Sequence, residues 1–296
     1  MSEFLGPTTT AIIVEVTRMS LLLAFLSAIF VPLELTFAAR PKKVFRAEFL
    51  IDLGYYVINS FVVAFVLSFP VGIIVWATHK TIPAVWLAST AAWPLWARAL
   101  GGLVAGEIGY YWGHRLSHEI PFLWDFHAIH HSAEEMDYLV SSRAHPIDLV
   151  FSRLCALAPI YALGLGAVNG TEGIKILLVV TFVGLIWGNF IHANLKWRFG
   201  PLEWLISTPG FHHWHHTKSG PINRNYSTML PWMDWLFGTL HLPANELPSD
   251  YGIKAKLPES LIGQLAYPLF PPSSVSAPAP ATPSEKTPMP WHKPEH

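Results

Sequence analysis

The sequence has few of the residues from which many functional sites are built. Its one cysteine, Cys155, excludes an intramolecular disulfide and any cysteine-cluster metal site. Charged residues make up only 13% of the chain, against about 25% in a typical soluble globular protein. The net charge of -1 provides no basic field that would attract a nucleic acid. The chain also lacks a Gly-x-Gly-x-x-Gly dinucleotide fingerprint, so we expect any electrons it uses to come from outside.

Apolar residues, by contrast, are abundant. Hydrophobic residues make up 52% of the chain and the mean hydropathy is +0.36, so we predict a polytopic membrane protein. The 13 tryptophans and 9 tyrosines suit long membrane–water interfaces. The N-terminal sequence MSEFLGPTTT has no positive n-region, and no clear small-residue cleavage site precedes Arg40. We therefore expect the first apolar run to be a retained membrane helix.

A membrane helix needs roughly 20 mostly apolar residues, and several segments of the chain meet this condition. The expected segments are residues 10–37, 49–77, 86–112, 149–167 and 174–191. The second is interrupted by Pro70. The third contains Pro94, Arg98 and Glu107, so we expect it to be broken or partly interfacial. The predicted fold class is an all-α membrane helical bundle with about four or five transmembrane helices.

Loop charge predicts how these segments are oriented. The loop RPKKVFR carries four basic residues, Arg40, Lys42, Lys43 and Arg46. The positive-inside rule places this loop in the cytoplasm. Counting crossings from there returns the chain to the cytoplasm near His114 and again at His192. Every dense histidine cluster would then belong to one cytoplasmic, histidine-rich cap that holds two metals.

Composition divides the chain into four expected parts. They are N-terminal transmembrane helices at 1–99, a histidine-rich catalytic domain at 100–245, a C-terminal extension at 246–270 and a tail at 271–296. The tail is rich in Pro, Ser and Ala without a hydrophobic period, so we predict that it is disordered. His292 and His296 lie there and are not expected to belong to any site.

Three histidine clusters stand out from this apolar background. They are HRLSH, with His114 and His118; HAIHH, with His127, His130 and His131; and HHWHH, with His212, His215 and His216. The second and third share one spacing, which is His, two residues, then His-His. His213 is an extra histidine inside the third cluster. Isolated histidines such as His79 and His241 are expected to be structural.

The spacing predicts how the imidazoles are directed. Residues three or four apart on a helix share a face, so His114 and His118 can aim at one point. Adjacent residues such as His130 and His131 point about 100° apart, so one can serve one metal and its neighbour another. A zinc ion takes about four ligands. The clusters supply at least eight imidazoles, which is enough for two metals with coordination positions left open.

Ligand type alone does not identify the metal, because imidazole suits iron, zinc, copper and nickel. The His-Glu-x-x-His motif of zinc hydrolases is absent, since Phe122 stands where the second histidine would follow His118 and Glu119. Carboxylate motifs of the Glu-x-x-His kind are also missing. A loose metal buffer would be one continuous tract, whereas these clusters are spread over about 100 residues. The motifs therefore favour an all-histidine dinuclear centre.

Six segments carry a family resemblance: YYWGHRLSH, LWDFHAIHHS, RAHP, FIHANLKW, TPGFHHWHHT and NYSTMLPWMDWLFGT. With their spacing, the region from about Gly102 to Leu242 resembles the fatty acid hydroxylase/sterol desaturase superfamily. The resemblance covers roughly half of the chain. In that superfamily the histidines bind a di-iron centre that activates O2 and oxidises lipid C–H bonds. The resemblance therefore implies two iron ions and an all-α membrane fold.

The resemblance also implies a ligand set, carried over position by position. The implied ligands are His114, His118, His127, His130, His131, His145, His192, His212, His215 and His216. His192 comes from the HAN segment and His145 from RAHP. His213 occupies a variable position between motif histidines, so we expect it to lie behind the ligands or on the surface.

Groups that accept the distal N–H of a ligand imidazole would fix its tautomer. The candidates are Glu107, Asp125, Asp137, Asp148, Asn189, Asn194 and Asn225, and helix capping or surface exposure is the alternative for each. Glu107 lies seven residues before His114 on the same helical face, and an acid in an apolar segment is costly unless it is used. Tyr110, Tyr111 and Tyr226 are expected to anchor the membrane interface or, as the alternative, to line a pocket.

The function implied by the resemblance is O2-dependent hydroxylation or desaturation of a lipid by an integral-membrane enzyme. The substrate would be a sterol, a fatty acyl chain, a glyceryl ether or a carotenoid. The expected partners are the membrane, O2 and an electron donor that is a ferredoxin, a cytochrome or a pterin. Two other classes stay open, a zinc-dependent membrane hydrolase and a histidine-rich metal-binding or transport protein. A transporter would carry histidines or acids along a path inside several membrane helices.

Overall fold

The computed structural model describes residues 7–41, 45–166, 171–244 and 246–270. These residues form helices and loops, with two isolated bridges and no strand among them, so the all-α prediction is confirmed. The helices are α1 (Pro7–Thr36), α2 (Phe49–Thr81), α3 (Ala84–Ala91), α4 (Leu95–Glu119), α5 (Pro121–His131), α6 (Pro146–Ala162), α7 (Thr171–His192), α8 (Pro209–His215), α9 (Trp232–Leu236) and α10 (Leu261–Ala266). Short 3-10 helices are η1 (Tyr138–Ser142), η2 (Gly200–Trp204) and η3 (Tyr267–Leu269). The predicted disordered tail at 271–296, with His292 and His296, lies outside the described residues.

Two helices are long and apolar enough to cross a membrane alone, through Thr9–Thr36 of α1 and Gly173–His192 of α7. The most apolar window of each is only 17% buried inside the protein, as expected of a helix whose sides face lipid. The halves of α2 meet at 41°, and they add a third span if they cross as one. This bend falls between Val63 and Phe65, nearly two turns before Pro70, which has no N–H to donate to the Val66 carbonyl.

Of the five expected spans, one is broken as expected and another is shorter than expected. Residues 86–112 fall into α3 and α4, because the chain breaks at Pro94, which cannot continue a helix by donating an N–H. Helix α6 is 17 residues long, shorter than the roughly 20 that a span requires. The structure thus supports two or three spans by length and composition, against the four or five expected.

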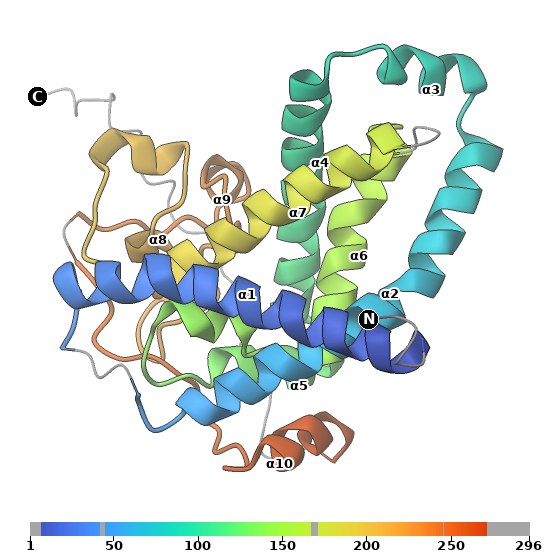
Figure 1. Cartoon of the computed structure of the whole chain (residues 1–296). Helices are drawn as coiled ribbons and strands as arrows, with labels where there is room; N and C mark the ends of the chain where they lie inside the picture. Colours follow the sequence, from blue (N-terminus) through green and yellow to red (C-terminus); the bar gives the residue numbers. More distant parts are fainter. Residues whose placement is uncertain (1–6, 42–44, 167–170, 245, 271–296) are drawn as a thin grey trace, which may run out of the picture.

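Helices α4 and α6 form the most extensive helix pair, side by side in Figure 1. Their backbones approach closely because glycines of α4 face α6. A Cβ atom added at Gly109 would lie 2.0 Å from the Cys155 carbonyl oxygen, and one at Gly113 would lie 2.7 Å from the Cys155 Cβ. Small residues allow such contact between helices in a membrane protein. The pair matters for the site, because α4 carries His114 and His118.

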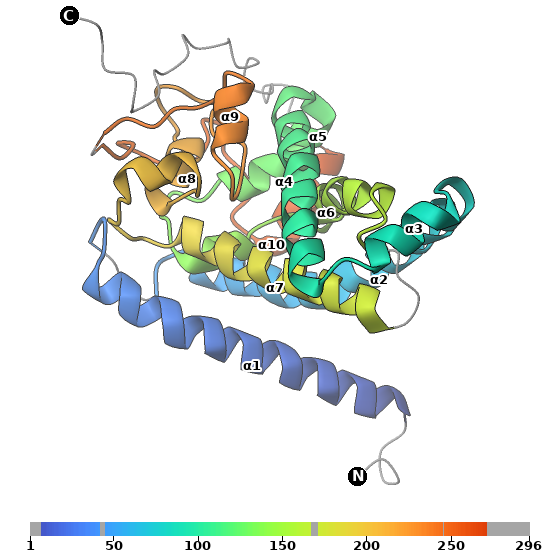
Figure 2. The same ribbon diagram turned by 90° about the horizontal axis from the view of Figure 1, so that it is seen from above.

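The C-terminal end of α1 is fastened to the rest of the protein by Glu34. The carboxylate is fully buried and accepts backbone N–H bonds from Tyr138 at 2.8 Å and Asn194 at 3.0 Å. The ring of Phe30 stacks on that of Tyr138, with centroids 5.7 Å apart. Helix α1 contacts α7 and lies along the outside of the molecule in Figure 2.

The short helices α5, α8 and α9 gather at one end of α4 and α7, opposite α3 (Figure 1). These helices and their connecting loops are called the cap below. The long helices therefore deliver their ends into a compact polar region. Because α7 ends at His192 and α4 ends at Glu119, both terminate with histidines inside the cap.

The close approach of α4 and α6 predicts that Gly109→Ala lowers the thermal-unfolding midpoint of the detergent-solubilised protein. The added methyl group must push α6 away, and overpacking of this kind costs roughly 1–3 kcal/mol. Gly184→Ala is the control, because no atom lies within 4 Å of its added Cβ and alanine favours a helix by about 1 kcal/mol. An unchanged midpoint for Gly109→Ala would contradict the packing described.

Candidate metal centre

Nine of the ten histidines implied as ligands converge in the cap. They are His114 and His118 from α4, His127, His130 and His131 from α5, His192 from α7, and His212, His215 and His216 from α8 and its C-cap. All are buried, with at most 8% of any residue exposed. Segments about 100 residues apart in the sequence thus bring their imidazoles to one place.

The ring nitrogens form two groups, within each of which one nitrogen per ring lies within 4.8 Å of all the others. The five-histidine group consists of His114, His118, His127, His131 and His215, and the four-histidine group of His130, His192, His212 and His216. Sequence neighbours fall into different groups, as helical geometry predicts. His131 and His130 separate in this way, and so do His215 and His216.

In the five-histidine group, Nε2 atoms face one another around His127. The Nε2 of His127 lies 3.1 Å from the Nε2 atoms of both His114 and His131. The Nε2 atoms of His118 and His215 are buried without a hydrogen-bond partner. A buried nitrogen of this kind is costly unless a ligand uses its lone pair. The arrangement therefore offers lone pairs to one ion.

The four-histidine group repeats the arrangement. The Nε2 of His192 lies 3.2 Å from that of His130 and 3.1 Å from that of His212. The Nε2 of His212 lies 3.2 Å from that of His216. Two nitrogens bound at about 2.1 Å to one ion would lie about 3.0–3.4 Å apart, so the observed separations fit shared coordination.

The outward ring nitrogens of six of these histidines have acceptors that fix their tautomers. Carbonyl oxygens of Tyr226, Arg143, Gly188 and Arg224 face Nδ1 of His114, His130, His192 and His215 at 2.6, 2.9, 2.6 and 2.7 Å. The side chains of Asn223 and Asp148 face Nδ1 of His118 and His127, each at 3.0 Å. A proton held on Nδ1 leaves the Nε2 lone pair free for a metal.

Asp148 is the carboxylate in this set of acceptors, as the sequence analysis allowed. It lies in the first turn of α6, beside His127. Burial opposes ionisation of Asp148, but the neighbouring His127 and its hydrogen bond outweigh this effect and lower the pKa of the carboxyl. The aspartate therefore stays charged. By accepting the Nδ1 proton of His127, it makes the Nε2 lone pair of that ring a stronger ligand for a metal.

The other acids and amides considered as partners have different contacts. Glu107 accepts hydrogen bonds from Met229 N at 2.6 Å, Thr228 Oγ1 at 2.7 Å and Leu230 N at 3.2 Å. Asp137 pairs with Arg46 and caps η1. Asp125 is half-buried on α5, whereas Asn189, Asn194 and Asn225 donate to backbone carbonyls. Glu107 thus holds the loop at 228–230 rather than a ligand ring.

His145 lies outside both groups. Its Nδ1 accepts a hydrogen bond from Ile147 N at 3.1 Å, and its Nε2 lies 3.2 Å from the carbonyl oxygen of Leu265. Both nitrogens are therefore engaged by the backbone, in contrast to the metal role implied by the RAHP motif. The residue instead caps the N-terminus of α6, and this places Asp148 in the first turn.

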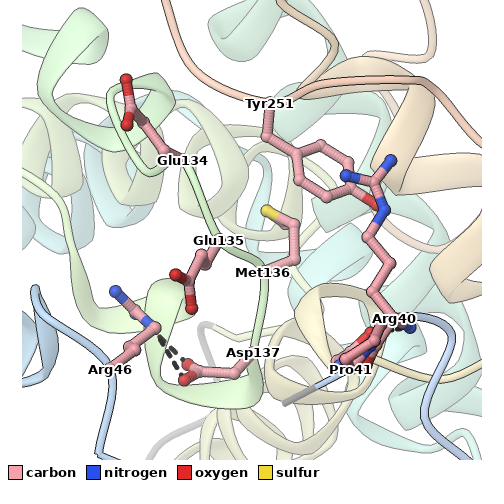
Figure 3. Close-up of a pocket in the computed structure, with 9 residues that line it drawn as sticks. Arg40, Pro41, Arg46, Glu134, Glu135, Met136, Asp137 and Tyr251 are labelled. Atoms are coloured by element: carbon pink, nitrogen blue, oxygen red, sulfur yellow. Dashed lines mark hydrogen bonds and ion pairs between the residues drawn. The ribbon is translucent and has the colours of Figure 1, made fainter. Parts of the chain in front are cut away.

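His213 is fully buried, which excludes the surface position and leaves the other expected position, behind the ligands. Its Nδ1 accepts from the Tyr251 hydroxyl at 2.9 Å, and its Nε2 donates to the Ala193 carbonyl at 3.1 Å. Burial lowers the pKa of His213 to about 4. Tyr251 lines a cavity of about 80 Å³ together with Arg40, whose guanidinium lies 4.2 Å above the tyrosine ring (Figure 3). His213 thus ties α8 to the segment after α7.

The tyrosines also differ from the interface anchors expected of them. Tyr111 and Tyr226 are fully buried within the protein. The ring of Tyr226 packs on His118 and His114, with centroids 5.1 and 6.0 Å apart. Tyr110 packs edge-on against His114 at 5.4 Å. The rings of Tyr110 and Tyr226 therefore cover the α4 histidines of the five-histidine group.

Sequence reasoning missed Asn223, which holds His118, and the four carbonyl acceptors. Asn223 and Asn225 have positive φ angles of 60° and 59°, a conformation that asparagine tolerates better than most residues. Two asparagines in the segment INRN were a usable signal for such a turn. No signal in the sequence identified the carbonyls, because every residue has one.

Electrostatics also favours metal binding. Burial, together with a smaller contribution from the nearby His127, lowers the pKa of His130 to about 4. Burial likewise lowers the pKa of His131, His215 and His216 well below the ordinary histidine value, with neighbouring imidazoles adding to the effect. These rings are therefore neutral at pH 7, which is the form that binds a metal.

Comparison with known proteins gives relatives that match about half of the chain. The ornithine lipid hydroxylase OlsE of Rhizobium tropici is 37% identical over 177 residues, which cover 60% of this chain and 51% of that protein. An alkylglycerol monooxygenase of Xenopus tropicalis is 29% identical over 168 residues, 56% of this chain and 34% of that protein. A very-long-chain aldehyde decarbonylase of Oryza sativa subsp. japonica is 33% identical over 154 residues, 48% and 22% of the two chains. The chain thus spans about half the length of the first relative and less of the others. No solved structure matches it.

Residues 99–239 match the model of the fatty acid hydroxylase family. This region contains all nine histidines of the two groups and the acceptors that orient them. Over residues 99–239, the chain is therefore similar to the fatty acid hydroxylase family.

Proposed function

We propose that this protein is a membrane-embedded oxygenase that holds two iron ions in its two histidine groups and hydroxylates a C–H bond of a lipid. The observation that carries the proposal is the convergence of nine buried imidazoles into one group of five and one of four. The names of an ornithine lipid hydroxylase and an alkylglycerol monooxygenase among the relatives support a lipid as substrate.

The five-histidine group fits iron better than zinc. A protein-bound zinc ion takes about four ligands, whereas the first group offers five nitrogens. A six-coordinate ferrous ion would keep about one position open in the first group and about two in the second. When bound, the iron ions would supply the O2 activation that oxidation of an unactivated C–H bond requires.

The residues of the chain orient the ligands and exclude water. The acceptors at Nδ1 hold six of the nine rings so that their Nε2 atoms face inward. Aromatic rings of Trp124 and Tyr226 pack on His118, with centroids 5.2 and 5.1 Å from its ring. Because these rings exclude water, the hydrogen bonds of the protein, rather than bonds to water, orient the neutral imidazoles.

Helix α4 gives a physical reason for a lipid substrate. Ile108, Trp112 and Leu116 are 38, 42 and 37% exposed on the same helix that directs His114 and His118 into the cap. A helix with its side chains is about 10–12 Å across. An acyl chain packed on the apolar side of α4 would therefore lie about one helix diameter from the five-histidine group.

We place the cap on the cytoplasmic side of the membrane. Arg40 and Arg46 of the basic loop lie against the cap, where they contact Tyr251 and Asp137. The positive-inside rule then supports the same side for the histidines. A soluble ferredoxin, a cytochrome or a reduced pterin could deliver electrons from that compartment.

We expect the purified protein to contain about two iron ions per chain and to consume O2 when given a reductant and a lipid substrate. His215→Ala should abolish turnover while leaving membrane insertion intact, because the histidine lies in the cap. Iron quantitation with Mössbauer spectra, O2 uptake and lipid mass spectrometry check these outcomes. Two zinc ions, no iron and no O2 uptake would overturn the proposal.

Asp148→Asn is expected to weaken iron retention by about 10–100-fold, because His127 loses a charged acceptor. The measurement is the rate at which a ferrous chelator removes iron from the purified protein. Asp125→Asn is the matched control, since this half-buried carboxylate precedes His127 by two residues on α5. Equal rates for the two variants would contradict the role given to Asp148.

A further inference from the structure

We propose that a buried ion network at the start of α2 positions the four-histidine group selectively, so that this group can lose its metal while the five-histidine group keeps its own. The inference rests on the proposed function, because it assumes two bound metals. Asp52 and Arg143 are the central positioning residues, and neither belongs to the histidine groups.

The network joins the basic loop, the first turn of α2 and the segment around η1. Arg46, Asp52, Asp137 and Arg143 are each at most 5% exposed. Asp52 accepts hydrogen bonds from both arginines. Arg46 Nε also donates to Asp137 at 2.9 Å (Figure 3), and Arg143 Nη1 donates to Glu48 at 2.8 Å. Four buried charges thus neutralise one another and fix the arginine side chains.

The network reaches the metal group through the backbone of Arg143. The carbonyl oxygen of Arg143 accepts the Nδ1 hydrogen bond of His130 at 2.9 Å. On either side, Asn59 of α2 donates to the carbonyls of Ser142 at 3.2 Å and Ala144 at 2.9 Å. Helix α2 therefore holds the segment on both sides of the one carbonyl that orients His130.

The five-histidine group is held by other elements. Its Nδ1 acceptors are Tyr226, Asn223, Arg224 and Asp148, which come from the loop after α8 and from α6. Asp234 of α9 holds that loop, because it accepts the N–H of Tyr226 at 2.7 Å. The closest link from the network is Ser132 Oγ, beside His131, at 3.4 Å from Arg143 Nη1. The two groups therefore have largely separate supports.

This arrangement connects a membrane helix to one metal group. Phe49 begins α2, and Asp52 lies in its first turn. If the two halves of α2 cross the membrane as one, the network stands where that helix enters the cap. The four-histidine group then depends directly on how α2 is seated, whereas α2 reaches the five-histidine group less directly, through its packing on α6, which carries Asp148.

The decisive variant is Asp52→Asn, which keeps the shape of the side chain and removes its charge. We expect bound iron to fall from about two ions per chain to about one. Adding His212→Ala should then lower the iron content no further, because the four-histidine group is already empty. Adding His118→Ala instead should remove the remaining iron. Retention of both ions, or loss of both, by Asp52→Asn would overturn the proposal.

Asn59→Ala tests the same segment without removing a charge, so it decides the matter if Asp52→Asn does not fold. We expect iron to leave this variant in two phases under chelator, with about one ion per chain lost faster than in the wild type. Ser60→Ala, which removes only a hydrogen bond within α2, is the matched control and should behave as the wild type. Unchanged iron loss in Asn59→Ala would count against the proposal.

Asp234→Asn is the reciprocal test, because Asp234 holds the loop whose carbonyls orient His114 and His215. When His212→Ala is added to Asp234→Asn, it should remove the remaining iron, whereas adding His118→Ala should not. The same pattern for Asp234→Asn and Asp52→Asn would overturn the selective role of the network. A wild-type protein that binds fewer than two metals would instead refute the proposed function.

Discussion

The proposed metal centre depends on the hydrogen bonds that six of its nine imidazoles make through their outward nitrogens. A buried neutral imidazole has one N–H and one lone pair, and only the lone pair can bind a metal. When an acceptor holds the proton on Nδ1, Nε2 faces inward without one. Carbonyl oxygens of the backbone provide this acceptor for His114, His130, His192 and His215. The geometry of the centre is therefore set by the conformation of the loops that carry these carbonyls.

Buried acids support those loops. Glu107 accepts three hydrogen bonds from residues 228–230, and Asp234 accepts the N–H groups of Tyr226 and Ser227. Asp52 holds Arg143. A buried carboxylate without donors costs several kcal/mol, and each of these three has at least two donors. These three acids therefore act on the histidines indirectly, through the backbone, whereas Asp148 contacts His127 itself.

The sequence was sufficient for what local geometry determines. The spacing of His114 and His118, and the divergence of His130 from His131, follow from the helical repeat alone. The hydrogen-bond partner of a side chain does not follow from the helical repeat. Glu107 lies on the same helical face as His114, yet it bonds the loop at 228–230. The RAHP motif placed His145 near the site, but its ring caps α6. Pro94 did indicate the break between α3 and α4, whereas length and hydropathy did not reveal that α6 has only 17 residues.

The two adjacent histidine pairs explain why the groups stay close together. His130 and His131 lie on α5, and His215 and His216 lie at the end of α8, so each pair contributes one ring to each group. Consecutive Cα atoms are about 3.8 Å apart, which is a covalent limit on how far the groups can separate. Across the boundary, the rings of His131 and His216 stack with centroids 4.4 Å apart. Helices α4 and α7 therefore each contribute histidines to a different group, while α5 and α8 contribute to both and keep the two groups close together.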